Sequence, residues 1–246
     1  MRILGWNCQG VCNASIVRAL GAQIKGARPD VVFLFKTKAN ENHMEYVKND
    51  LKFDNKCVME AKGRAGGLCI MWKAGVSIKE VEFDKNLIAV KVSDSVTDWL
   101  LVGFDGPPYY SKKKKAWGNL FALLESHQGP WVCIGDFNCI LNEDEQVGGC
   151  KGSSSAINYL KELMFEYNAV DLGYSGDKFT WAKGKWGNAS IKRRLGRGVA
   201  SIAWRLAYPK ATISHLSAIN SDHAPIMLDT NPSDTFTHRP FRFKAV

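Results

Sequence analysis

Short apolar runs, each bounded by polar or turn-forming residues, recur along the 246-residue chain. The run VVFLF at residues 31–35 has no polar position, which is typical of a strand buried on both faces of a sheet. Similar runs elsewhere predict further strands. The predicted strands are RILGWN, VVFLF, GGLCIMW, LIAVKV, WLLVGF, WVCIGDF and APIMLD.

Apolar residues at i, i+3 and i+4 spacing predict helices over residues 15–27, 113–126 and 155–167, with Ser15 and Ser155 as N-caps. Strands dominate, and several central ones precede the first long mid-chain helix. This order favours two packed sheets with helices outside them over one parallel sheet. Since no repeat, linker or low-complexity stretch interrupts the pattern, we expect one domain over residues 1–231. An extended basic and aromatic exit segment would follow at 232–246.

The composition narrows the class of protein. Hydrophobic residues make up 46% of the chain, enough for a sizeable core, and no apolar run reaches the roughly 18 residues that span a membrane. The seven cysteines are scattered without CxxC pairs, which argues against a disulfide framework or a zinc site. Because nothing resembles a signal peptide, we expect reduced thiols and a nuclear or cytoplasmic protein that is not secreted.

The net charge of +9 comes from one segment. Residues 178–221 hold nine Lys or Arg and no acidic residue, whereas the other 24 basic residues balance the 24 acidic ones. Trp181 and Trp186 lie among these cations, which favours a surface that contacts a nucleic-acid backbone over a merely solvated basic face. The candidate nucleic-acid-binding residues are Lys178, Lys183, Lys185, Lys192, Arg193, Arg194 and Arg197. A second basic run, SKKKK at 111–115, opens a predicted helix and could extend this surface.

Three motifs place polar side chains at strand ends: Asn7 in WNCQG, Asp136 and Asn138 in IGDFN, and Asp222 and His223 in NSDHAP. Each alone is ordinary turn chemistry. Taken together and in this order they form a specific set.

That set resembles the endonuclease/exonuclease/phosphatase family, which contains DNase I-like nucleases and abasic-site endonucleases. The similarity extends nearly end to end, through ILGWNCQG, GRAGGLCIMW, WVCIGDFN, DLGYSGDKFTW and SDHAPIML. It is strongest to the endonuclease domain of plant non-LTR retrotransposons, in which an exit like RPFRF leads towards a reverse transcriptase. The resemblance implies an α/β fold, a four-layer α/β/β/α sandwich. It also implies Mg²⁺-assisted hydrolysis of a phosphodiester, since Mg²⁺ suits an oxygen-ligand site.

The resemblance also implies roles for the matching residues. Asn7 and Asp222 match the metal site, and Asp136 would orient or deprotonate the attacking water. Asn138 would hold the phosphate, and His223 would contact the scissile phosphate.

Three positions depart from the family pattern. Lys36 stands where the family has its principal metal-ligating glutamate, and an ammonium has no lone pair to offer a metal. Asp105 replaces a phosphate-site tyrosine. Gly196 replaces the aspartate that orients the histidine, so that the ring loses its partner.

The family residues at these positions carry a formal charge of −2, whereas Lys36, Asp105 and Gly196 sum to zero. The difference equals the charge of one Mg²⁺ ion. We therefore expect the Lys36 ammonium to take the place of the metal and to pair with Asp105, Asp136 or Asp222. Drift in a decayed mobile-element copy and a repurposed site both remain open as the origin.

The sequence thus predicts a catalytically impaired protein that binds no Mg²⁺ and contacts the DNA backbone without strong sequence preference. One alternative is an active Mg²⁺-dependent nicking endonuclease that recruits another ligand. Glu41 and Glu45 follow Lys38 closely, but we expect them on a helix, out of reach. The other alternative is an interaction module that uses the same fold to bind a protein partner.

Overall fold

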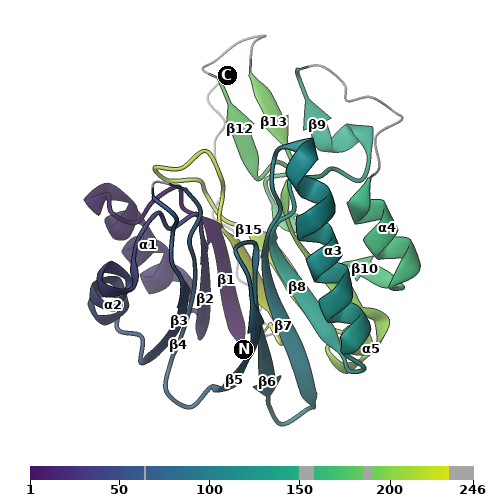
Figure 1. The fold of residues 1–246 in the computed structure, drawn as a ribbon, viewed down its shortest axis with the longest axis horizontal. Helices are drawn as coiled ribbons and strands as arrows, with labels where there is room; N and C mark the ends of the chain where they lie inside the picture. The colour runs from purple at the N-terminus through teal and green to yellow at the C-terminus, as the bar shows by residue number, and fades with distance from the viewer. Residues whose placement is uncertain (64, 150–157, 185–189, 233–246) are drawn as a thin grey trace.

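The computed structural model describes residues 1–63, 65–149, 158–184 and 190–232, and its two large sheets pack face to face (Figure 1). The first sheet has the strand order β11-β15-β16-β1-β2-β4-β3. Its strands are β1 (Arg2–Asn7), β2 (Val31–Phe35), β3 (Asn55–Met59), β4 (Leu68–Trp72), β11 (Ser175–Gly176), β15 (Thr212–His215) and β16 (Ile226–Asp229).

The second sheet has the order β10-β14-β8-β7-β6-β5. Its strands are β5 (Ser77–Phe83), β6 (Leu87–Ser93), β7 (Asp98–Asp105), β8 (Trp131–Asp136), β10 (Ala169–Asp171) and β14 (Gly196–Ser201). The helices are α1 (Ala14–Ala27), α2 (Glu41–Asp50), α3 (Tyr110–Ser126), α4 (Tyr159–Glu166), α5 (Ile202–Ala207) and the 3₁₀ turn η1 (Glu143–Glu145).

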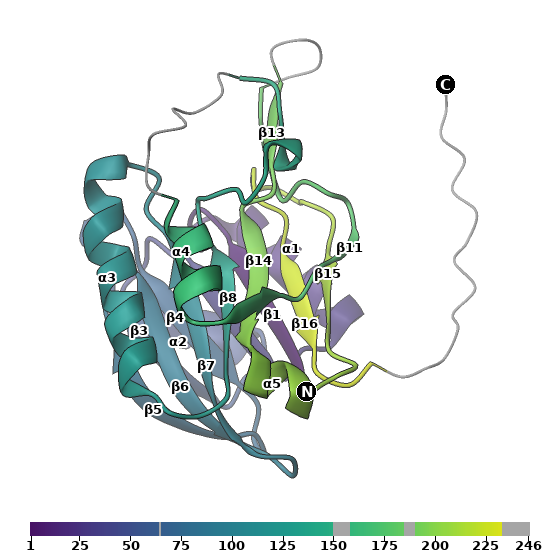
Figure 2. The same cartoon turned by 90° about the vertical axis from the view of Figure 1, so that its right-hand side faces the viewer.

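The core explains why strands such as β2 are apolar throughout. Val31, Phe33 and Phe35 point between the sheets into one buried cluster, whereas Val32 and Leu34 pack outward under α1 and α2. On the second sheet, α3 and α4 cover the outer face in the same way. The central strands of each sheet are therefore buried on both faces, and the predicted four-layer α/β/β/α sandwich is confirmed (Figure 2).

The helix starts differ from the sequence expectation. α1 is capped by Asn13, whose side chain accepts a hydrogen bond from the Ser15 amide at 2.9 Å, so that Ser15 lies inside the helix. α4 is capped by Asn158. Ser155 and residues 233–246 of the expected exit segment lie outside the described residues. Among those described, no helix is long and apolar enough to cross a membrane.

A third, small sheet of β12 (Trp181–Lys183), β13 (Ile191–Arg193) and β9 (Gln146–Val147) projects beyond the two large ones (Figure 1). We call β12 and β13 the basic arm. A bridge between Trp181 and His223 joins the arm to the loop before β16. The arm therefore stands at the edge of the sandwich where the polar strand ends gather.

Two parallel strand pairs determine that edge. β1 runs parallel to β2, and β7 runs parallel to β8 with Asp105 opposite Asp136. The carboxyl ends of all four strands therefore reach the same end of the sandwich, two from each sheet. β14 begins there as well, because Gly196 pairs with Asp136.

Candidate active site

Lys36 lies between two carboxylates of the opposite sheet. Its Nζ atom is 3.4 Å from Asp105 Oδ1 and 3.7 Å from Asp136 Oδ2. Lys36 directly follows β2, whereas both aspartates end strands of the second sheet, so the ion pairs span the seam between the sheets. Of the three expected partners, Asp105 and Asp136 form ion pairs with Lys36.

Asp136 is the central acceptor of the site. Its Oδ2 atom accepts a hydrogen bond from Asn7 Nδ2 at 2.8 Å and lies 3.3 Å from His223 Nδ1. Its Oδ1 atom accepts the backbone amide of Asn138 at 3.1 Å. Since Lys36 also approaches Oδ2, four groups compete for this one carboxylate.

The two oxygens of Asp222 contact different aromatic side chains. The Nε2 atom of His223 lies 3.8 Å from Asp222 Oδ1, and the other oxygen of Asp222 accepts the indole N–H of Trp181 at 2.8 Å. Gly196 offers no side chain to the ring. A small cavity of about 10 Å³ lies between His223, Gly196 and Thr180, with room for about one water molecule.

The space at Gly196 would accept a side chain. A Cβ there would meet the side chains of Ile226 and Thr180 at 3.4 Å, an ordinary contact distance. The Gly196 amide already donates to Thr180 Oγ1 at 2.7 Å, so the backbone is held in place without a residue side chain. A Cβ atom at position 196 is therefore sterically tolerated.

Protonation follows from burial and from these neighbours. Burial opposes the charge of Lys36, but Asp105 and Asp136 outweigh it and hold the pKa of Lys36 above its usual value. Burial raises the pKa of Asp105 to about 7, in spite of Lys36. Burial also disfavours ionised Asp136, yet His223 and Lys36 keep its pKa below the usual value. Burial lowers the pKa of His223, so the ring is neutral at neutral pH.

The pocket is thus close to electrical balance without any added cation. One ammonium faces one ionised aspartate and a second aspartate near its titration midpoint. Lys36 achieves this position with a backbone φ of +55°, in the left-handed region that lysine rarely adopts. Such a conformation persists only where surrounding contacts impose it.

The residues of the site do not fit a magnesium ion. Asn7 Oδ1 is a buried oxygen with no hydrogen-bond donor, as a metal ligand could be, but the nearby carboxylates already face an ammonium. No three His, Cys, Asp or Glu side chains in the described part of the chain are arranged to hold a metal. Glu41 and Glu45 lie on α2 and pair with Lys56, as expected of residues that do not reach the site.

The basic arm carries part of the predicted cationic surface. Lys183 and Lys192 are exposed, and the half-buried Arg193 guanidinium lies 5.8 Å from the centre of the Trp181 ring. Lys178 is exposed but pairs with Asp144 at 2.7 Å. Lys185 lies outside the described residues.

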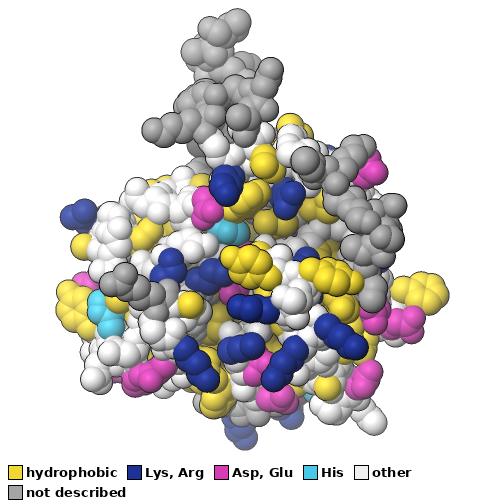
Figure 3. Space-filling view, turned by 45° about the horizontal axis from the view of Figure 1, so that its top comes forward, with side chains coloured by type: hydrophobic (Ala, Val, Ile, Leu, Met, Phe, Trp, Pro, Cys, Tyr) yellow, Lys and Arg dark blue, Asp and Glu magenta, His cyan; other side chains and the backbone are white. Residues whose placement is uncertain are grey.

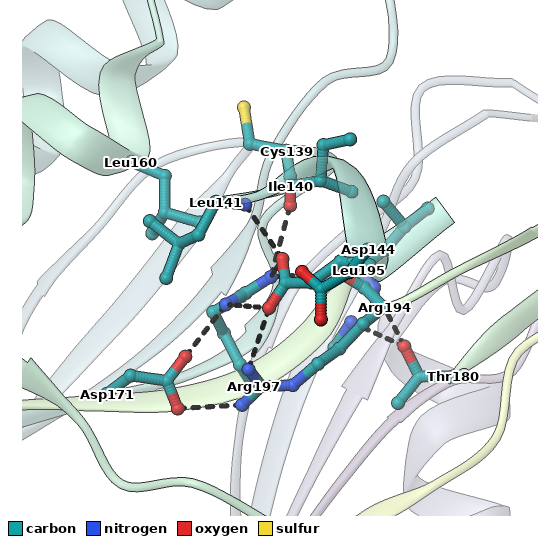
Figure 4. A network of polar contacts seen from close by, with 12 residues as sticks. Cys139, Ile140, Leu141, Asp144, Leu160, Asp171, Thr180, Arg194, Leu195 and Arg197 are labelled. Carbon is teal, nitrogen blue, oxygen red and sulfur yellow. Dashed lines mark hydrogen bonds and ion pairs between the residues drawn. The ribbon is translucent and has the colours of Figure 1, made fainter. Parts of the chain in front are cut away.

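Arg194 and Arg197 correct the sequence-based prediction, because both are buried. Each guanidinium bridges Glu145 and Asp171, with N–O distances of 2.7 to 2.9 Å (Figure 4). Two cations and two anions cancel inside this network, which joins η1, β10 and the start of β14. These arginines therefore stabilise the fold and present no charge to a ligand.

The start of α3 also lies near the site, and of its residues the sequence had pointed only to the SKKKK run. Lys113, in the SKKKK run, donates to the Asn138 carbonyl at 2.8 Å, and Asn138 Nδ2 donates to the Gly106 carbonyl at 2.7 Å. Tyr109 and Tyr110, just before the SKKKK run, are exposed. The sequence does contain a signal for the two tyrosines, since they form an adjacent aromatic pair just before the SKKKK run. Figure 3 shows Lys and Arg side chains gathered on this face, with hydrophobic side chains among them.

The fold and the set of strand-end residues define a DNase I-like nuclease or phosphatase architecture. The Endonuclease/Exonuclease/phosphatase family model matches residues 4–212, and the chain belongs to that family, whose members are generally metal-dependent. No curated protein sequence matches closely enough to be counted as a relative.

Solved structures share the fold at low sequence identity. The endonuclease domain of TRAS1, a telomere-specific non-LTR retrotransposon, superimposes with a TM-score of 0.68 at 13% identity, over 93% of this chain and 97% of that one. The AP endonuclease of Archaeoglobus fulgidus superimposes with a TM-score of 0.69 at 14% sequence identity, over 93% of this chain and 98% of that one. The 3'-5' exonuclease NExo of Neisseria meningitidis superimposes with a TM-score of 0.67 at 16% sequence identity, over 93% of this chain and 99% of that one. At these identities the similarity establishes the fold.

Proposed function

We propose that this protein is a nucleic-acid-binding DNase I-like domain in which Lys36 occupies the place of the catalytic metal ion, so that phosphodiester hydrolysis is very weak or absent. The observation that carries the proposal is the position of the Lys36 ammonium between Asp105 and Asp136. A second cation placed there would be repelled by the ammonium and would find the carboxylates already neutralised.

The remaining groups cannot perform the hydrolysis efficiently. His223, Lys36 and the hydrogen bonds from Asn7 and the Asn138 amide outweigh burial and lower the pKa of Asp136, which makes it a weak base for an attacking water. His223 is neutral and has no carboxylate at position 196 to align it. Loss of an activating metal or of part of a catalytic unit costs several orders of magnitude in rate.

Phosphate binding makes different demands, since it needs positive charge and hydrogen-bond donors rather than a metal. Lys36 lies at the site, and Lys183 and Lys192 are exposed on the adjoining basic arm. Cations on several elements around one site favour contacts to the phosphate backbone, which carry no sequence information. DNA is therefore the partner that we propose.

We further propose an origin in the endonuclease domain of a plant non-LTR retrotransposon. The motifs from ILGWNCQG to SDHAPIML support this origin, and the fold that the chain shares with the TRAS1 endonuclease domain is consistent with it.

Nicking of supercoiled plasmid tests the proposal that hydrolysis is very weak or absent. The unmodified chain is compared, in Mg²⁺ and in EDTA, with the variant Lys36→Glu, Asp105→Tyr, Gly196→Asp. We expect nicking only by the triple variant and only in Mg²⁺. The triple variant with Asp136→Asn added controls for contaminating nuclease. Nicking by the unmodified chain in Mg²⁺, abolished by EDTA, would show an active enzyme that uses another ligand.

Binding to a DNA duplex tests the proposal that the protein contacts the phosphate backbone. Affinity for a DNA duplex should fall steeply as salt is added, because each lysine–phosphate contact releases counterions. An absence of salt-dependent binding would leave the protein-interaction module as the better explanation.

A further inference from the structure

Two neighbouring aromatic side chains are exposed next to the candidate active site. Tyr109 has 66% of its surface exposed and Tyr110 has 58%. Other tyrosines near α3 are used in packing, since Tyr159 stacks on Trp117 and Tyr167 stacks on Phe121. Adjacent large rings left in solvent beside a charged site indicate a binding surface.

The fold fixes the position of these rings relative to the site. Asp105 ends β7, and the Gly106 amide donates to the Asp136 carbonyl at 2.7 Å. A Cβ at Gly106 would lie 2.4 Å from the Phe137 carbonyl oxygen, so only glycine permits this close crossing of the two loops. Pro107 and Pro108 then restrict the backbone that leads to Tyr109.

The far side of the same loop is also anchored. Lys113 binds the Asn138 carbonyl at 2.8 Å, and Asn138 Nδ2 binds the Gly106 carbonyl at 2.7 Å. Tyr109 and Tyr110 thus lie between two fixed points, a few residues from Asp105 on one side and from Lys113 on the other. A ligand whose phosphate is at the site would have its neighbouring groups near these rings.

The charge around the rings identifies the class of ligand. The Lys112 ammonium lies 5.5 Å from the centre of the Tyr109 ring, and Lys114 and Lys115 are exposed on the next turn of α3. Aromatic faces interleaved with cations match single-stranded nucleic acid, whose bases stack on rings while its phosphates pair with lysine. A fully paired duplex offers no free base faces, so the tyrosines would contribute less to binding it.

We propose that Tyr109 and Tyr110, with Lys112, Lys114 and Lys115, form a stacking platform for the unpaired bases of a nucleic acid whose phosphate backbone is bound at the adjacent site. This platform gives the protein a preference for substrates with a single-stranded segment over uninterrupted duplex. The inference rests on the proposed function, because it specifies which nucleic acid that surface binds.

Fluorescence anisotropy with three labelled probes tests the platform: a blunt DNA duplex, the same duplex with a short single-stranded overhang, and a single-stranded RNA. The proteins are the unmodified chain, Tyr109→Ala/Tyr110→Ala, Tyr109→Phe/Tyr110→Phe, and Phe165→Ala. Phe165 is 80% exposed on α4 and serves as a matched control for loss of an exposed ring. Thermal unfolding confirms that every variant is folded.

We expect the unmodified chain to bind the overhang probe more tightly than the blunt duplex. The double alanine variant should lose about 10- to 100-fold in affinity for the overhang probe, as expected for one or two stacked bases, and little for the duplex. The double phenylalanine and Phe165→Ala variants should retain the preference. Binding of the RNA at similar strength would extend the platform to RNA, and weak binding would restrict it to DNA.

Two results would overturn the platform. If the double alanine variant binds the overhang probe as tightly as the unmodified chain, or loses overhang and duplex binding equally, the tyrosines do not stack on bases. Salt-dependent duplex binding by the unmodified chain is compatible with either result and would leave the proposed function intact. A chain that binds no probe at any salt concentration would overturn both.

Discussion

The Lys36 ammonium lies 3.4 Å from the carboxylate of Asp105, across the seam between the two sheets. An ammonium carries half the charge of Mg²⁺, cannot activate water as a Lewis acid, and is tied to the chain. With Asp136 nearby, the ammonium brings the charges of the pocket close to balance at neutral pH. This geometry therefore lets the pocket hold its buried carboxylates without a bound ion.

Reversing the charge at Lys36 should destabilise the protein in the absence of metal. Lys36→Glu places a third carboxylate beside Asp105 and Asp136, and it should lower the free energy of unfolding by about 2–3 kcal/mol. Added Mg²⁺ should recover part of this loss, because it would bind the folded state only. Thermal unfolding in EDTA and in Mg²⁺ measures both effects. Lys38→Glu, two residues away and exposed, is the control; an equal response of both variants would contradict a local metal site.

Asp105 should make the protein less stable as the pH rises. Its folded pKa of about 7 lies above the usual carboxyl value of about 4, so the folded state retains a proton that the unfolded state releases. Between pH 5 and pH 8 this group alone should reduce stability by about 2–3 kcal/mol. Asp105→Asn should remove that loss. Urea unfolding of both proteins at pH 5 and pH 8 measures it, and a parallel pH dependence in the two proteins would contradict the raised pKa.

The buried network of Figure 4 should be essential for folding. Glu145→Gln leaves Arg194 and Arg197 with an incomplete set of partners in the interior and should cost about 3–5 kcal/mol of stability. Asp144→Asn removes the exposed ion pair to Lys178 on the same turn and should change stability little. Chemical denaturation of the two variants compares them directly. Equal stabilities would show that the network contributes no more than a surface pair.

The basic arm should contribute to duplex binding through charge alone. Lys183→Ala and Lys192→Ala should each weaken binding uniformly across DNA sequences. Each should also reduce the slope of log affinity against log salt concentration by about 1. Lys25→Ala, in the last turn of α1, is the control because its position lies away from the strand ends that form the site. Titrations at several salt concentrations provide the slopes. Unchanged slopes in both arm variants would place the phosphate contacts elsewhere.

The sequence predicts the strands that hydrophobic burial alone determines. Runs such as VVFLF and WVCIGDF are apolar because both of their faces are covered, and they became β2 and β8. β14 was missed because Gly196–Ser201 includes an arginine and two glycines. Its Arg197 is buried only because Glu145 and Asp171 reach it from distant parts of the chain. No local pattern shows such a pairing.

The site itself was predictable to a large extent. Asn7, Asp136, His223 and Lys36 come together as expected, because the carboxyl ends of parallel strands meet at one edge. Which carboxylates face Lys36 depended on how the two sheets pack, and this emerged only in three dimensions. The same is true of Arg194, whose charge the sequence places at the surface and the fold places inside.

The hydrogen bond from Asn7 to Asp136 joins the last residue of β1 in one sheet to the last residue of β8 in the other. This buried hydrogen bond thus connects the two halves of the sandwich directly. Replacing Asn7 would leave Asp136 without this donor from the opposite sheet, and replacing Asp136 would leave the buried Asn7 amide without its acceptor. Asn7 and Asp136 therefore hold the two sheets together independently of any part they take in hydrolysis.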